Sequence, residues 1–232
     1  MKKIIYIQFV AFICAFKCFC QNQGTNGTYY VLDPNHAGKI FHNPTSETNR
    51  ILGTPYTQTK FAYAEIENIP DKHFMRYNAY SDNFEFITFK NDTLEMEKMD
   101  NINNITFTKP YKKYSYLNYI SNTKGRKKGY LVEMYTKGDF LLYKKEAVTF
   151  YAGKKAKNTL ETDISANYSK VSYSYFFKTK TGNIIPFPEN KKQLIKLYPD
   201  KKQEIETFIK ENKVSFSEDY DRIKIIDFLS AL

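Results

Sequence analysis

Cysteine is missing from residues 21–232, because Cys14, Cys18 and Cys20 all lie within the first twenty positions. The chain from Gln21 onward therefore offers no disulfide framework, no thiolate nucleophile and no cysteine ligand for a metal ion. It is nevertheless long enough to bury a core without cross-links, since a domain of roughly 200 residues hides about 70% of the surface that its unfolded chain exposes.

Histidine is also scarce, with His36, His42 and His73 as the three examples. A zinc or nickel site needs several such ligands held on rigid elements, and His36 and His42 lie in a segment without periodicity. The sequence from Gln21 contains no phosphate-binding loop, no serine-hydrolase elbow, no metalloprotease motif and no dinucleotide fingerprint. We therefore predict no metal site and no cofactor, and we assign no catalytic residue.

Long hydrophobic runs are missing apart from residues 4–16, an uncharged and mostly apolar stretch that follows Lys2 and Lys3. A membrane-spanning helix needs about 20 apolar residues, and Lys17 interrupts this stretch too early. The pattern is typical of a cleavable signal peptide over residues 1–20, with the mature protein beginning near Gln21. We therefore expect an exported protein, periplasmic or secreted, whose mature chain has no transmembrane segment.

The two cysteines closest to the expected cleavage site leave a second interpretation open. Cys18 and Cys20 occupy the positions at which signal peptidase accepts small residues, which favours cleavage before Gln21. A lipoprotein would instead carry an acyl chain on one of these cysteines, which would anchor it to a membrane. Lipoproteins usually have small residues directly before the acylated cysteine, whereas Phe16 and Lys17 precede Cys18.

Residues 56–187 show a period of two, which places successive side chains on opposite faces of a strand. Residues 61–64, 94–97, 105–108 and 171–177 are the clearest alternating runs. Turn-forming residues separate the strands at 81–83, 91–92, 124–125, 137–138 and 181–183. Strands so close in sequence are joined by hairpins, so we predict a mainly β protein with an antiparallel meander folded as a sandwich or an open barrel.

The period changes near Pro188, and residues 188–232 are predicted to form two or three short helices that pack on the β body. Asn190 with Gln193 and Asp200 with Gln203 have the spacing of capping boxes, and Ser217 is a candidate cap for the last helix. Residues 21–55 are rich in Asn, Gly, Thr and Pro and are predicted to be an irregular lead-in.

Positive charge is unevenly distributed. The 35 basic residues exceed the 25 acidic ones, and between Asn101 and Asn158 the acidic residues are only Glu133, Asp139 and Glu146. Tyrosines are interspersed among the lysines of this basic stretch. Tyrosine rings can stack on sugars, and the lysines attract anions, so the stretch favours binding of sugars or anionic ligands. The candidate surface comprises Lys109, Lys112, Lys113, Tyr114, Tyr116, Lys124, Arg126, Lys127 and Lys128.

These observations lead to two functional hypotheses. The first is a non-enzymatic binding or scaffolding module of the cell envelope, whose partner is an anionic glycan, a lipid headgroup or an envelope protein; nucleic acid is a less suitable partner for an exported protein. The second is an envelope hydrolase with a carboxylate pair on the β body, because two strands can bring such a pair together. Its candidate residues are Glu65, Glu67, Glu85, Glu95, Glu97 and Glu133.

Several stretches resemble an uncharacterised family of exported Bacteroidota proteins: Gly53-Thr54-Pro55-Tyr56, the runs 76–86, 129–133 and 141–145, and the lysine-rich end from 191 to 232. The resemblance covers about 53–232. It implies a Gram-negative envelope or secreted location and an ordered β body with a helical end, and it implies no catalytic residue. It also implies that Asp92-Thr93-Leu94 is an O-glycosylation acceptor, with Thr93 as the modified residue.

Overall fold

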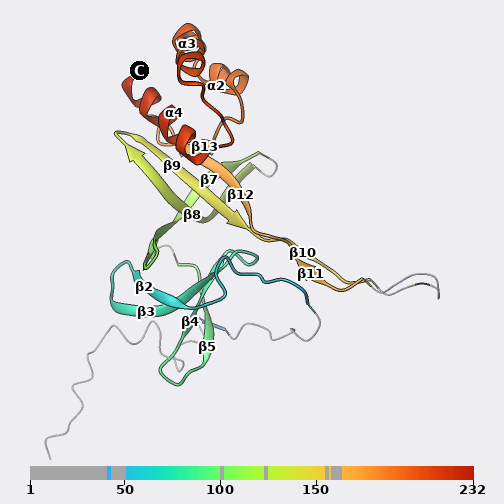
Figure 1. Ribbon diagram of the computed structural model, residues 1–232. Helices are drawn as coiled ribbons and strands as arrows, with labels where there is room; N and C mark the ends of the chain where they lie inside the picture. The colour runs from blue at the N-terminus through green and yellow to red at the C-terminus, as the bar shows by residue number, and fades with distance from the viewer. Residues whose placement is uncertain (1–40, 43–50, 100–101, 123–124, 155–156, 158–163) are drawn as a thin grey trace, which may run out of the picture.

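The computed structural model describes residues 41–42, 51–99, 102–122, 125–154, 157 and 164–232. The predicted signal peptide and most of the predicted lead-in lie outside these residues. Within them the protein is mainly β, with three short α-helices gathered at one end of the sheet (Figure 1). In the part of the chain that the structure describes, no helix is both long enough and apolar enough to span a bilayer.

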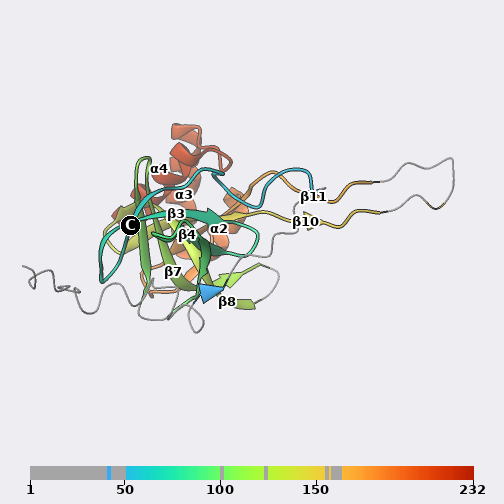
Figure 2. The same ribbon diagram turned by 90° about the horizontal axis from the view of Figure 1, so that it is seen from below.

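The main sheet has the order β1-β5-β4-β3-β2-β6-β7-β8-β9-β12-β13, and each strand pairs with its neighbours in antiparallel direction. It is not closed into a barrel. Its strands are β1 (Phe41–His42), β2 (Ala62–Ile66), β3 (Ile69–Asn78), β4 (Asn83–Ile87), β5 (Thr93–Met96), β6 (Asn104–Thr108), β7 (Tyr111–Ser121), β8 (Gly125–Lys137), β9 (Phe140–Ala147), β12 (Ser172–Lys178) and β13 (Ile184–Pro186). A separate ribbon of β10 (Phe150–Tyr151) and β11 (Asn167–Tyr168) projects away from the sheet (Figure 2).

The predicted turns separate the observed strands and confirm the meander. Asp82 and Asn91 adopt the left-handed conformation that Asn and Asp tolerate, with φ of 57° and 66°. Gly138 and Gly182 also have positive φ at the β8–β9 and β12–β13 turns. Most strands therefore pair with the strand that precedes or follows them in the chain.

The hydrophobic core has three parts. The first lies against strands β2 to β8 and includes Phe84, Phe86 and Tyr114. The second lies between the sheet and the helices and includes Phe177 of β12 and Leu194, Ile205 and Ile226 of the helices. The third lies inside the curled end of the sheet, where the ring of Tyr119 on β7 meets that of Phe176 on β12 at 4.8 Å between centroids.

The helical end consists of α2 (Lys191–Leu197), a 3₁₀ turn η1 (Pro199–Lys201), α3 (Lys202–Asn212) and α4 (Asp219–Ala231). Asn190 caps α2 as predicted, because its side-chain oxygen accepts a 3.0 Å hydrogen bond from the backbone N–H of Gln193. The other two predicted caps are wrong. Asp200 lies inside the 3₁₀ turn, so Lys201 is the residue that precedes α3. Glu218, not Ser217, precedes α4. Neither Lys201 nor Glu218 makes a side-chain capping bond.

A partly buried ion pair connects the β3–β4 turn to strands β8 and β9. Asp82 accepts hydrogen bonds from the ammonium group of Lys145 and, at 2.7 Å, from the hydroxyl of Tyr77. The carboxylate also lies 3.3 Å from Lys98 Nζ. Gly129 faces this carboxylate, and a Cβ at that position would lie 2.5 Å from Asp82 Oδ2. The missing side chain of Gly129 therefore makes the space that the carboxylate occupies.

Candidate functional site

The β7–β8 register gathers part of the predicted basic surface on one exposed face. Successive cross-strand pairs there are Tyr116 with Tyr130, Asn118 with Lys128 and Ile120 with Arg126. Residues directly opposite each other point to the same side of a sheet. We call the resulting set the basic hairpin face; it comprises Tyr116, Asn118, Ile120, Arg126 and Lys128.

Cations lie close to the aromatic ring of this face. Lys128 Nζ is 4.6 Å from the centroid of the Tyr116 ring, and Lys98 Nζ is 5.9 Å from it. The stretch 114–132, which forms most of the two strands, contains no acidic residue. The Tyr116 ring packs against Tyr130 at 5.0 Å between centroids, so a partly buried aromatic ring lies beside these cations.

The remaining predicted residues are placed elsewhere. Lys112 and Tyr114 lie on the same face of β7 as Tyr116, but at the other end of the strand, where both contact the buried Glu146. Lys112 Nζ lies 2.6 Å and 2.8 Å from its two oxygens, and the Tyr114 hydroxyl donates at 2.7 Å. Burial and the charge of Glu146 raise the pKa of Tyr114. Lys113 points to the other face, 3.1 Å from Glu133 Oε2.

The other three of the nine residues complete this picture. Lys109 is exposed in the β6–β7 turn, Lys127 is partly buried on the side of β8 opposite Lys128, and Lys124 lies outside the described residues. Two of the nine predicted residues, Arg126 and Lys128, thus supply the charge of the basic hairpin face, and Tyr116 supplies its ring.

The candidate carboxylates include one cross-strand pair, Glu85 on β4 and Glu95 on β5. Glu85 is fully buried, and its Oε2 accepts bonds of 2.8 Å and 2.6 Å from the guanidinium of Arg76. Its Oε1 accepts bonds from the Tyr56 hydroxyl at 3.0 Å and the Asn78 amide at 3.3 Å. Both oxygens are therefore occupied by the protein's own donors.

The other candidate carboxylates are separated from this pair. Glu65 forms an exposed ion pair with Lys72, and Glu67 accepts a bond from the Asn104 amide. Glu97 is exposed, and Glu133 pairs with Lys113. Thr93, the predicted glycosylation site, is the partly buried first residue of β5.

The histidines do not form a cluster in the described part of the chain. His36 lies outside it, and His42 lies in β1. His73 lies on β3, where burial lowers its pKa and its Nε2 has no hydrogen-bond partner. Among the described residues, no three acidic, histidine or cysteine side chains come together as metal ligands.

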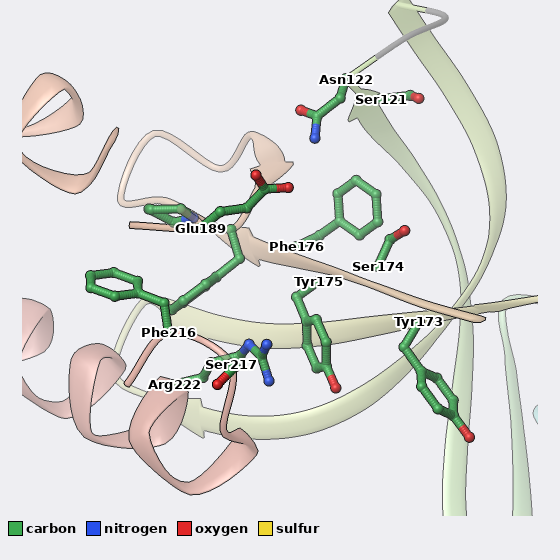
Figure 3. A pocket seen from close by; sticks show the side chains of 12 residues that line it. Ser121, Asn122, Tyr173, Ser174, Tyr175, Phe176, Glu189, Phe216, Ser217 and Arg222 are labelled. Carbon is green, nitrogen blue, oxygen red and sulfur yellow. The ribbon is translucent and has the colours of Figure 1, made fainter. Parts of the chain in front are cut away.

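The structure also contains a cleft that the sequence patterns did not predict (Figure 3). Its volume is about 520 Å³, and it lies where the end of β7, the strand β12, the chain after β13 and the start of α4 meet. It has both aromatic and polar walls. The lining residues are Ser121, Asn122, Tyr173, Ser174, Tyr175, Phe176, Phe187, Pro188, Glu189, Phe216, Ser217 and Arg222.

A stacked arginine forms one wall of this cleft. The guanidinium carbon of Arg222 lies 3.6 Å from the centroid of the Tyr175 ring, and its Nη1 donates a 2.7 Å bond to Asp219. Burial, followed by a hydrogen bond to Asp219 and the charge of that carboxylate, raises the pKa of Tyr175 to about 12. These contacts fix the tyrosine ring and balance the charge of the arginine.

We expect the raised pKa of Tyr175 to make the protein less stable in alkali. The ordinary tyrosine pKa is 10.0 and the folded value is higher, so the stabilising effect is complete below pH 10 and is lost as the pH rises toward 12. Urea unfolding at pH 8 and pH 11 should show a smaller loss for Tyr175→Phe than for the wild type. Tyr63→Phe, an exposed control, should behave as the wild type; equal losses for all three proteins would contradict the assignment.

The sequence signals for this cleft are weak because its walls come from segments far apart in the chain. Pro188 follows β13 by two residues, and the alternation at 171–177 indicates β12, but neither indicates that α4 returns beside them. Comparison with protein families, curated proteins and solved structures finds no match for this chain. The basic hairpin face and the cleft therefore have to be interpreted from their own geometry.

Proposed function

We propose that this protein is an exported, non-enzymatic binding module that holds an anionic glycan on its basic hairpin face. The observation that carries the proposal is the β7–β8 register, which sets the exposed Arg126 and Lys128 on the same face as the partly buried Tyr116 ring. A sugar ring stacks on such an aromatic surface, and its carboxylate or sulfate groups pair with the adjacent cations.

The interior carboxylates support a binding function over a hydrolytic one. Asp82, Glu85 and Glu146 are each held by a cation and by a tyrosine hydroxyl. A general acid must release its proton and a nucleophile must reach the substrate, whereas these groups are committed to internal bonds. The three carboxylates are therefore arranged as structural ion pairs that connect strands of the sheet to one another.

The binding proposal predicts salt-sensitive affinity for an acidic polysaccharide. Polygalacturonate should bind the wild type at low salt and dissociate as sodium chloride is raised, because exposed charges are screened. The double variant Arg126→Gln, Lys128→Gln should bind about twofold to thirtyfold more weakly, since two exposed ion pairs of about 0.2–1 kcal/mol each are lost. Isothermal titration at several salt concentrations measures both effects.

A matched control distinguishes an effect of the basic hairpin face from an effect of the protein's net charge. Lys192 and Lys196 are exposed on α2, and replacing both with Gln removes the same charge at a different place. If this control weakens binding as much as the hairpin variant does, the basic hairpin face is not the site. Preferential binding to phosphatidylglycerol vesicles over polygalacturonate would identify a lipid headgroup in place of a glycan.

The second candidate function is a glycan hydrolase that uses Glu85 and Glu95. The observation favouring it is their position opposite each other on β4 and β5, since directly opposed Cβ atoms lie about 4.5–5.5 Å apart. Retaining glycosidases place their carboxyl groups about 5–5.5 Å apart, so Glu85 would have to leave Arg76 and the Tyr56 hydroxyl to act in such a pair. Turnover of envelope glycans that disappears in Glu95→Gln would support this candidate over the binding module.

A further inference from the structure

The cleft beside β12 follows the edge of a strand and not one of its faces. Four consecutive residues of this strand, from Tyr173 to Phe176, line the same cavity. Successive side chains of a strand point to opposite faces, so a cavity over one face would be lined by every second residue. Figure 3 shows β12 passing along the cleft with these side chains on both sides of it.

The backbone of Tyr173 points into this cleft. Tyr175 O accepts a 2.8 Å bond from the N–H of Phe187, which places the polar backbone groups of Tyr175 on the β13 side of the strand. The N–H and C=O of one residue point to the same side, and the direction alternates along the strand. The backbone N–H and C=O of Tyr173 therefore point to the β13 side as well.

The neighbouring strand ends before it reaches Tyr173. β13 pairs with Phe176, Phe177 and Lys178, and its last bond to β12 is the one that the Phe187 N–H donates to Tyr175. Pro188 then has no N–H to donate, and the chain bends at Glu189 and Asn190 before α2. On its other edge, β12 pairs with β9 from Ser172 to Lys178. Among the described residues, no strand pairs with the outer edge of β12 at Tyr173, so its ladder stops inside the cleft.

The opposite wall is formed by a second part of the same curled sheet. Ser121 and Asn122 at the end of β7 lie across the cleft from β12, and β13 occupies the space between β7 and β12 lower down. The cleft therefore continues the space that β13 fills. A further strand would fit there at the usual spacing of about 4.8 Å from β12.

We propose that this cleft binds an extended peptide from a partner protein, which adds to β12 as a strand in line with β13. Main-chain hydrogen bonds to Tyr173 would give affinity, and alternate peptide side chains would lie toward Phe176 on one side and Phe216 on the other. The charge of Arg222 is balanced by Asp219, and Glu189 adds a negative charge to the lining, so the cleft favours a segment without acidic side chains. This inference goes beyond the proposed function and uses different elements, so either can fail without the other.

The test compares two substitutions at one position. Tyr173→Ala and Tyr173→Pro both remove the ring, but only proline removes the N–H, and proline is tolerated where the N–H faces away from the sheet. A random twelve-residue peptide display library is selected on Tyr173→Ala, and the enriched peptides are then measured against both variants. We expect affinity for Tyr173→Pro to be at least about tenfold weaker, the effect of about 1.4 kcal/mol for lost main-chain bonding.

A second measurement does not depend on the proline variant folding. Peptides enriched on the wild type are resynthesised in two versions, one with the odd-numbered and one with the even-numbered backbone amides methylated. Methylation blocks strand pairing through those amides without changing the side chains. Each version defines one register. Loss of binding in one register and slower hydrogen exchange at the Tyr173 amide support the proposal. Equal binding of the two methylated versions overturns the proposal, as does failure to enrich any peptide. It is also overturned if a second copy of this chain or a soluble glycan fragment is found to occupy the cleft.

Discussion

Replacing Asp82 with asparagine is expected to lower the free energy of unfolding by about 2–3 kcal/mol, because the largely buried Lys145 ammonium group loses a charge-assisted hydrogen bond. The Lys145 side chain is 14% exposed and would lose its carboxylate. Burial already lowers the pKa of Lys145, and Asp82 opposes that shift. Asparagine tolerates the positive φ at this turn, so the substitution changes the charge and not the backbone.

Chemical denaturation at pH 7 measures this effect, with Asp139→Asn as the control. Asp139 also lies in a hairpin turn, but it is exposed. The control should remain within about 0.5 kcal/mol of the wild type. A loss below about 1 kcal/mol for Asp82→Asn would mean that Lys145 finds water or another partner, and that the turn is not fastened by this ion pair.

Replacing Glu85 with glutamine should lower the free energy of unfolding by about 2–4 kcal/mol, because the Glu85 side chain is 1% exposed while its partner Arg76 is 19% exposed and can be partly hydrated. Glutamine keeps the shape of glutamate but brings an NH₂ group into a site where Arg76 and the Tyr56 hydroxyl both donate. The Arg76 guanidinium, stacked 3.6 Å from the centroid of the Tyr56 ring, would lose its ionic partner.

Glu97→Gln is the matched control for this change, because Glu97 lies just after β5 and is exposed. Unfolding midpoints followed by far-UV circular dichroism should separate the two variants clearly. Equal midpoints would show that Glu85 contributes no more than a surface carboxylate, and would remove the main reason for assigning it a structural role.

Much of the fold could be predicted because its signals are local. Turn residues such as Asn91 and Gly138 mark hairpins, and each hairpin determines the pairing of the two strands that it joins. The cap at Asn190 was predictable for the same reason. The caps predicted at Asp200 and Ser217 were wrong because short loops and a 3₁₀ turn shifted the helix starts, which depends on tertiary packing.

The basic surface was only partly predictable. Lys112 and Lys113 are adjacent in sequence, but a strand directs them to opposite faces, so they cannot belong to one patch. The register that aligns Lys128 with Asn118 depends on the length of the β7–β8 turn. The cleft was not predictable, because its walls at Ser121, Tyr173 and Phe216 meet only after the sheet has curled and α4 has packed against it.

The strand order also has a consequence for the folding pathway. Most neighbouring strands can pair soon after the short turn between them forms. Strand β2 is different, because it lies between β3 and β6 in the sheet. Its residue Ala64 pairs with Phe107, and strands β3 to β5 lie between these two residues in the chain. Closing that long loop costs entropy before its contacts form. We expect strands β2 to β5 and the strands from β6 onward to form two separate groups of hairpins early. Pairing of β2 with β6, which joins the two groups, is expected to be the slow step.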